Sequence, residues 1–344
     1  MKILFWGTPA YAVPTLQALH TAGHTIVGVV TQPDRRRGRG KQLMPSAVKA
    51  AALEIDVPVF TPERIRNDLA CQEQLASLKA DLYVVVAFGQ ILPQSVLDQA
   101  PLGCWNGHGS LLPRWRGAGP IQWCLLEGDR ETGVGVMAME AGLDTGPVLL
   151  ERKLTIGLRD NANTLGQRLS ELTAGLMVEA MPLIEAAGPG SEADRLAKLG
   201  VVRQGDDSVY ARMLGKEDFL INWEQSALSI HRKVMGLFPG AATRWKGKRL
   251  KVTETEPLIR RLADQLSPEA ATLADQWGLD PDQDAKPSTR PGQILAVAPE
   301  HGLIVATQGC PVLIREAQLE GKARATGRQL IQQLQAVEGD RLGD

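Results

Sequence analysis

The feature that most constrains the fold of this chain is the alternation of strand-like and helix-like segments in its first half. Residues 82–87 form a continuous apolar run, which is typical of a central parallel strand that is covered on both faces. Further strand-like runs lie at 2–6 and 25–31, with helical patterns between them. This alternation predicts a Rossmann-like, doubly wound α/β fold with a mostly parallel sheet.

A second domain is predicted by the change of composition at residues 188–191, Gly-Pro-Gly-Ser. Beyond residue 209, short β-like runs separated by turns predict a smaller, OB-like β-barrel. We therefore expect an α/β domain at 1–188, a linker at 189–208, a β-barrel domain at 209–337 and a tail at 338–344.

Charge is distributed unevenly, although the formal net charge is only −1. Residues 35–41, RRRGRGK, carry five positive charges in seven residues. Residues 209–260 contain ten Lys or Arg and five Asp or Glu, a net charge of +5, whereas 262–290 contain six acidic and two basic residues, a net charge of −4. We interpret 262–290 as an exposed insertion in the barrel. On charge alone, 35–41 is either a solvated loop or an RNA contact.

Cysteine usage and hydropathy predict a cytoplasmic protein. Cys71, Cys104, Cys124 and Cys310 lack CxxC spacing and zinc-ligand histidines, so we expect reduced thiols, no disulfide and no metal. No apolar run reaches the roughly 18 residues of a membrane span. The first residues run directly into a glycine turn, so we interpret them as a buried strand rather than a signal peptide.

The residues with the clearest chemistry lie near residues 104–108. If these form a strand, Asn106 and His108 point to the same face at its carboxyl end, where open α/β sheets bind ligands. Asp144 follows in the Gly-rich turn 141–147. Such a trio suits acyl transfer, because histidine relays protons, a carboxylate orients it and an amide stabilises an oxyanion. Chemistry alone leaves open a structural Asn–His pair and a turn-forming aspartate.

This segment resembles the 10-formyltetrahydrofolate-dependent formyltransferases. Their shared pattern is Asn-x-His-x-Ser-Leu-Leu-Pro followed by an Asp in a Gly-rich turn. The resemblance implies that 10-formyltetrahydrofolate is the co-substrate and that Asn106, His108 and Asp144 are catalytic. It also implies two sets of folate contacts: Ser110, Leu111, Leu112 and Pro113, and a loop similar to the pterin-pocket loop of the family, with Phe88, Gly89, Gln90, Ile91 and Leu92.

A longer pattern resembles the methionyl-tRNA formyltransferases within that family. The matching stretches are residues 5–9, 31–34, 38–41, 43–45, 113–117, 142–146 and 238–241, so the resemblance spans nearly the whole chain apart from 262–290 and the tail. It implies formyl transfer to the amino group of methionyl initiator tRNA for translation initiation, by a monomer. The basic loop is then expected to reach the end of the acceptor stem, while the C-terminal domain holds its backbone. The candidate tRNA contacts are Arg35, Arg36, Arg37, Arg39, Lys41, Arg232, Lys233, Arg244, Lys246, Lys248, Arg249 and Lys251.

Gly107 and Gly109 depart from the family pattern, which usually has Val and Ala there, and we expect them to loosen the strand end. One alternative is a formyltransferase for a small amine, such as glycinamide ribonucleotide or an amino sugar, but this leaves the basic loop and second domain unexplained. A dinucleotide-dependent dehydrogenase is disfavoured because the first turn, residues 7–10, lacks GxGxxG. A noncatalytic RNA-binding module leaves the trio unexplained.

Overall fold

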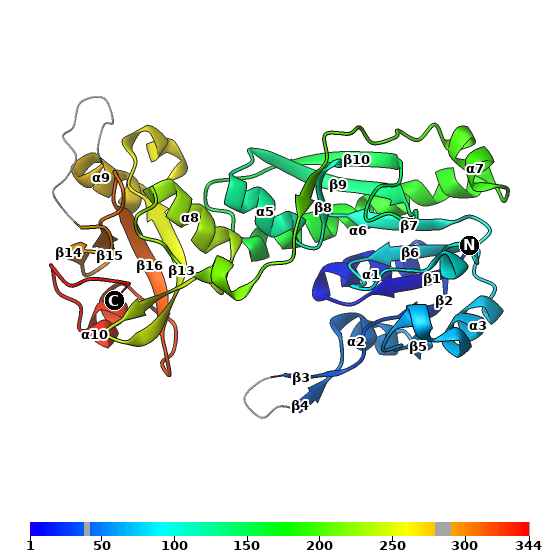
Figure 1. The fold of residues 1–344 in the computed structure, drawn as a ribbon, viewed down its shortest axis with the longest axis horizontal. Coiled ribbons are helices and arrows are strands. Elements are labelled where there is room, and N and C mark those ends of the chain that lie inside the picture. Colours follow the sequence, from blue (N-terminus) through cyan, green and yellow to red (C-terminus); the bar gives the residue numbers. More distant parts are fainter. Residues whose placement is uncertain (38–41, 279–289, 344) are drawn as a thin grey trace. The chain divides into compact units, whose positions relative to one another are not determined.

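The computed structural model describes residues 1–37, 42–278 and 290–343, and the chain divides into two compact units. Unit 1 comprises residues 1–120, 131–155 and 166–212. Unit 2 comprises residues 121–130, 156–165 and 213–344. Neither unit is one continuous stretch of sequence, and the colours of Figure 1 follow the chain from its N-terminus to its C-terminus.

Unit 1 is built on a seven-stranded sheet with the order β10-β9-β7-β6-β1-β2-β5. Five neighbouring strands are parallel, and β9 is antiparallel to both β7 and β10. The Rossmann-like, mostly parallel sheet predicted from the sequence is thus confirmed. Its strands are β1 (Lys2–Gly7), β2 (Thr25–Val30), β5 (Val59–Phe60), β6 (Leu82–Val86), β7 (Cys104–His108), β9 (Glu131–Ala138) and β10 (Val148–Thr155).

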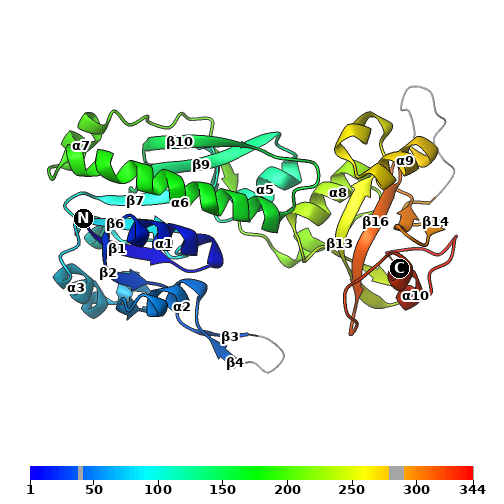
Figure 2. The ribbon, with the colours of Figure 1, turned by 180° about the vertical axis from the view of Figure 1, so that it is seen from behind.

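Helices cover both faces of this sheet. On one face, α3 and α4 contribute Leu75 and Leu97 to an apolar core with Leu4, Trp6 and Tyr83 of the strands. On the other face lie α1 and α6, as Figure 2 shows. The helices of this part of the chain are α1 (Val13–Thr21), α2 (Ala47–Glu54), α3 (Leu69–Ser77), α4 (Gln94–Leu97), α6 (Ala162–Ala187) and α7 (Glu192–Leu199), with 3-10 turns η1 (Ala10–Ala12) and η2 (Ile65–Asn67).

The segment expected to be a linker, residues 189–208, is ordered against unit 1. It contains α7, whose first turn is capped by the Ser191 side chain accepting from the Asp194 amide and whose end is closed by Gly200 in the left-handed conformation. After α7, Val202 forms a bridge to Val148 of β10. The chain then pairs β11 (Val209–Ala211) in parallel with β8 (Arg114–Gly117).

Unit 2 is built on a six-stranded antiparallel sheet. Five of its strands follow the order β12-β13-β16-β15-β14, and the sixth, β17, pairs with β16. Its strands are β12 (Ala242–Trp245), β13 (Lys248–Pro257), β14 (Ile294–Ala298), β15 (Gly302–Val305), β16 (Val312–Leu319) and β17 (Ala325–Thr326). Its helical elements are α5 (Pro120–Glu127), α8 (Ala227–Gly236), α9 (Pro268–Trp277) and α10 (Gly327–Leu334), with η3 (Lys216–Phe219) and η4 (Arg260–Gln265). The smaller β domain predicted after the α/β domain is therefore present.

The acidic segment differs from expectation over its first half. Residues 262–278 are folded: Ser267 caps α9, Pro268 opens it, and Ala270 and Ala274 are buried in a small core with Leu258. The expectation of an exposed insertion is wrong for this stretch, because one face of α9 is made of small apolar residues. Residues 279–289 lie outside the described part of the chain. Among the described helices, none combines the length and apolar character needed to cross a membrane.

Candidate active site

The carboxyl end of β7 brings together the first two predicted catalytic residues. The strand occupies the residues predicted for it, Cys104–His108, between β6 on one side and β9 on the other. Within it, Asn106 lies opposite both Val85 and Met137. Because side chains alternate along a strand, Asn106 and His108 share one face.

His108 is held in one tautomer by its surroundings. Its ring is buried, with an exposed fraction of 6%. Nε2 lies 3.0 Å from the Trp115 carbonyl oxygen. A carbonyl can only accept, so Nε2 carries a proton. Nδ1 points to the Asp144 carboxylate, with 3.7 Å between Nδ1 and Oδ2. Nδ1 is therefore the ring atom available to gain or lose a proton during a reaction.

Asp144 completes the trio from the turn between β9 and β10. Its backbone is left-handed, with φ +52°. Its Oδ2 accepts a hydrogen bond from the Gly117 amide at 2.8 Å, and its Oδ1 lies 3.4 Å from the Asn106 side-chain nitrogen. Gly146 must be glycine, because an added Cβ would lie 1.8 Å from the Ala138 carbonyl oxygen. One carboxylate thus lies beside both the imidazole and the amide.

The sequence did not reveal Gln204, which braces this turn. Its side-chain nitrogen donates to the carbonyl oxygens of Asp144 and Gly146, at 2.9 and 2.6 Å. Its side-chain oxygen accepts from Nε of Arg116, a residue with an exposed fraction of only 8%. Arg116 and Gly117 lie in a stretch that matched the family pattern, whereas Gln204 lies in the predicted linker and gave no signal.

Gly107 tightens the strand end instead of loosening it. A Cβ at this position would lie 2.6 Å from the Thr173 methyl carbon on α6 and 3.4 Å from Met177. The Thr173 hydroxyl is fixed by Tyr11 at 2.8 Å and by the Leu169 carbonyl at 2.7 Å. The expectation of a loosened strand is therefore wrong at Gly107, because the side chain of Thr173 fills the space that the glycine leaves.

The four residues predicted to contact folate after His108 form a turn with two buried side chains. Ser110 is fully buried, and its hydroxyl donates to the Arg114 carbonyl at 2.7 Å. Leu112 is also buried and precedes Pro113 through a cis peptide bond. Leu111 and Pro113 are partly exposed. Of these four side chains, those of Leu111 and Pro113 are therefore the ones accessible from outside the turn.

The second predicted folate segment, residues 88–92, is mixed in exposure. Phe88 and Leu92 are buried in the core of unit 1, where Phe88 packs edge-on against Trp6. Gln90 accepts from the Ile65 amide at 2.8 Å. Ile91 is 69% exposed, and Gly89 adopts φ +85°. The accessible parts of this loop are therefore Gly89 and Ile91.

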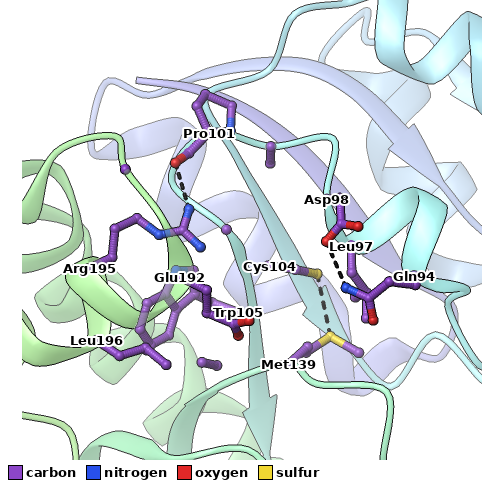
Figure 3. Close-up of a pocket in the computed structure, with 14 residues that line it drawn as sticks. Gln94, Leu97, Asp98, Pro101, Cys104, Trp105, Met139, Glu192, Arg195 and Leu196 are labelled. Atoms are coloured by element: carbon purple, nitrogen blue, oxygen red, sulfur yellow. Dashed lines mark hydrogen bonds between the residues drawn. The ribbon is translucent and has the colours of Figure 1, made fainter.

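A pocket of about 200 Å³ opens beside the start of β7 (Figure 3). Cys104, on the same strand face as Asn106, lines it, with Sγ 3.5 Å from the Met139 sulfur. Arg195 of α7 closes another side and donates to the Pro101 carbonyl at 2.6 Å. Burial raises the pKa of the Cys104 thiol well above its ordinary value, so this sulfur is a packing group rather than a nucleophile.

The basic residues of the 35–41 loop begin a two-stranded hairpin. We call β3 (Arg35–Arg37) and β4 (Gln42–Met44) the basic hairpin; they pair antiparallel. Arg35 and Arg36 are exposed opposite the exposed Met44 and Leu43. Two of the predicted contacts, Arg39 and Lys41, lie outside the described residues.

The predicted basic cluster of unit 2 separates into exposed and inward-facing residues. Arg244, Lys246, Lys248 and Arg249 are exposed around the β12–β13 turn, where Lys246 and Gly247 adopt positive φ. Lys251 is partly exposed.

Two other members of the cluster face the interior of unit 2. Lys233 donates to the Asp218 carbonyl at 2.9 Å, and burial lowers its pKa. The guanidinium of the partly buried Arg232 occupies the space over Gly128. These contacts set Arg232 and Lys233 apart from the exposed set.

Comparisons with known protein families and with related proteins point to the same family over nearly the whole chain. A family model described as formyl transferase matches residues 1–181, and a model of the formyl transferase C-terminal domain matches residues 213–335. The chain is 69% identical over 343 residues to a methionyl-tRNA formyltransferase from Synechococcus sp. strain WH7803, covering 100% of this chain and 98% of that protein. It is 66% identical over 344 residues to a methionyl-tRNA formyltransferase from Parasynechococcus marenigrum strain WH8102, covering 100% of both.

Among solved structures, the fold is similar to WlaRD, described as a sugar 3N-formyl transferase. The TM-score is 0.59 with 16% sequence identity, and the match covers 94% of this chain and 99% of WlaRD. At that identity the likeness concerns the fold alone.

Proposed function

The chain belongs to the methionyl-tRNA formyltransferases of the formyl transferase family, and from this we propose that it transfers the formyl group of 10-formyltetrahydrofolate to the amino group of methionyl initiator tRNA. The observation that carries the proposal is the convergence of Asn106, His108 and Asp144 at the carboxyl end of β7. Relatives with the same activity in their names match the full length of the chain.

The first step of the proposed reaction is attack by the methionyl amine on the formyl carbon. An α-amino group has a pKa of about 7.7–8.0, so a substantial neutral fraction exists near neutral pH. As the nitrogen–carbon bond forms, the formyl oxygen becomes an oxyanion. The Asn106 amide and a protonated Nδ1 of His108 are the donors positioned to stabilise it. A donor of this kind contributes about 3 kcal/mol to transition-state stabilisation.

The second step is collapse of the tetrahedral adduct. The bond between the formyl carbon and the folate nitrogen breaks, the carbonyl re-forms, and the proton lost by the attacking amine is delivered to the folate nitrogen. The Asp144 carboxylate takes the proton that the amine loses, and Nδ1 of His108 gives its own proton to the folate nitrogen. Because Oδ2 of Asp144 lies 3.7 Å from Nδ1, Asp144 can then return a proton to the imidazole. The Gly117 amide stabilises the Asp144 carboxylate between steps. Together Asp144 and His108 form the proposed proton relay.

Binding of the two substrates is assigned to separate groups of residues. The folate is proposed to lie along the turn of Leu111 and Pro113 and the loop of Gly89 and Ile91, which expose these residues near the strand ends. The tRNA is proposed to contact the basic hairpin and the exposed cations of the β12–β13 turn, where Arg and Lys can neutralise phosphates. Since translation initiation is a cytoplasmic process, we place the chain there, acting as a monomer.

The test is a transfer assay with purified full-length chain, 10-formyltetrahydrofolate and methionyl initiator tRNA. The product is released by deacylation and identified as formylmethionine by mass spectrometry. Its formation by the wild type and not by Asp144→Asn supports the proposal. Transfer to glycinamide ribonucleotide or an amino sugar, with none to the tRNA, would replace it by the small-amine alternative.

A further inference from the structure

The residue that holds the Asp144 turn comes from the segment that follows α7. Asp144 is a non-glycine residue in the left-handed region, which costs free energy unless the surroundings hold it. The side-chain nitrogen of Gln204 donates two hydrogen bonds to this turn, one to the Asp144 carbonyl oxygen at 2.9 Å and one to the Gly146 carbonyl oxygen at 2.6 Å. These bonds fix the backbone on both sides of Thr145.

The same side chain is itself fixed at its other end. Its oxygen accepts a hydrogen bond from Nε of the buried Arg116 at 2.9 Å. Arg116 lies in β8 between Trp115, whose carbonyl fixes His108, and Gly117, whose amide holds the Asp144 carboxylate. Gln204 thus joins the two backbone segments that position the imidazole and the carboxylate.

We infer that Gln204 is a positioning residue for the Asp144–His108 relay. It contacts no reacting atom; it keeps Oδ2 of Asp144 directed at Nδ1 of His108. The inference rests on the proposed function, because the relay belongs to that mechanism. A displacement of about 1 Å in a catalytic group can reduce turnover about 100-fold, so loss of the brace should lower kcat more than it changes KM for either substrate.

Two variants separate the possible roles of this side chain. Gln204→Ala removes all three hydrogen bonds. Gln204→Glu keeps the size and the acceptor for Arg116, but replaces the donor nitrogen with a carboxylate oxygen that faces the two carbonyl oxygens. We expect both to lower kcat about 10- to 100-fold. Arg203→Ala, at the exposed neighbouring residue, is the matched control and should keep the wild-type rate. A wild-type kcat for Gln204→Glu overturns the inference, because the two donors would then be unnecessary.

A double-mutant cycle tests whether Gln204 acts through Asp144. In an Asp144→Asn background, Gln204→Ala should lower kcat by less than about twofold, because the relay is already broken. A full, independent loss in that background overturns the inference.

Hydrogen–deuterium exchange of the whole chain gives a readout that needs no activity. Gln204→Ala should speed exchange in residues 140–147 and at Gly117, while Arg203→Ala should not. Unchanged exchange there overturns the inference, even if the wild type proves to formylate another amine. Failure of the wild type to formylate tRNA, with faster exchange in Gln204→Ala, overturns the proposed function and leaves the brace established.

Discussion

At the scale of single residues, hydrogen bonds to the backbone decide which atom of each side chain can still contact a substrate or exchange a proton. The Trp115 carbonyl occupies Nε2 of His108, so only Nδ1 can exchange a proton with Asp144. The Gly117 amide occupies one side of the Asp144 carboxylate. Asn106 makes a long 3.4 Å contact with the other carboxylate oxygen, so its amide can turn toward a ligand at little cost.

Asp144→Asn isolates the charge of this carboxylate. Asparagine tolerates the left-handed backbone and still accepts from the Gly117 amide, so the fold should persist. Loss of the proton acceptor should lower kcat by about 10² or more. Steady-state kinetics and a thermal melt measure the two effects. A variant with the wild-type melting temperature and near-normal turnover would remove Asp144 from the mechanism.

At the scale of elements, α6 packs closely against β7 at Gly107, and this contact fixes the position of the strand. Gly107→Ala should destabilise the protein by about 1–3 kcal/mol and lower activity, because the new Cβ meets the Thr173 methyl group. Thr173→Ser removes that methyl group and keeps the hydroxyl that bonds Tyr11 and Leu169. The double variant should therefore regain most of the melting temperature. No recovery would show that another neighbour limits the space.

Another element-scale prediction concerns the buried ion pair that joins β13, β16 and α9. Burial alone would raise the pKa of Glu256, but hydrogen bonds from Ser267 and Arg315 outweigh it and hold this pKa below its ordinary value. A lowered folded pKa stabilises the protein above the unfolded pKa of about 4.3, and this contribution disappears as pH falls through the folded value.

Glu256→Gln should therefore have a lower melting temperature than the wild type at neutral pH. The difference between the two melting temperatures should narrow as pH falls below about 4. Thermal melts across a pH series measure this difference. Ser226→Ala, at the exposed cap of α8, provides a control whose effect should not depend on pH in that range. A constant gap between wild type and Glu256→Gln from neutral pH to pH about 3 would contradict the assigned pKa direction.

At the scale of the whole molecule, the positive charge proposed for tRNA binding occurs in both units. Arg35→Ala with Arg36→Ala removes two exposed cations from the basic hairpin. We expect a higher KM for tRNA. We also expect the slope of log KM for tRNA against log salt concentration to be shallower by up to about 2. Arg152→Ala with Lys153→Ala removes equal charge from strand β10 and serves as the control. Equal salt slopes for wild type and hairpin variant would exclude phosphate contacts by Arg35 and Arg36.

Much of the fold followed from local patterns in the sequence. Periodicity located β6 and β7, and the spacing of two predicted the shared face of Asn106 and His108. The signals for α9 are also local, because Ser267, Pro268 and Glu269 form a typical helix start, but the expectation of an exposed insertion rested on the acidic composition of the segment alone.

Gln204 could not be predicted, because its partners lie 58 to 88 residues away and its neighbours are typical of a loop. The backbone contacts of Trp115 and Gly117 were hidden for a different reason: main-chain groups carry no sequence signature. The sequence thus predicted the side chains that we propose to do the chemistry, whereas the groups that orient them required the three-dimensional structure.

The most direct test of the account is a competition assay with labelled 10-formyltetrahydrofolate and three acceptors in one reaction: methionyl initiator tRNA, methionyl elongator tRNA and glycinamide ribonucleotide. We predict that label enters the initiator tRNA alone and that this incorporation is lost in Asp144→Asn. Incorporation into glycinamide ribonucleotide with none in either tRNA would contradict the proposed acceptor, and would leave the basic hairpin and unit 2 without their proposed role.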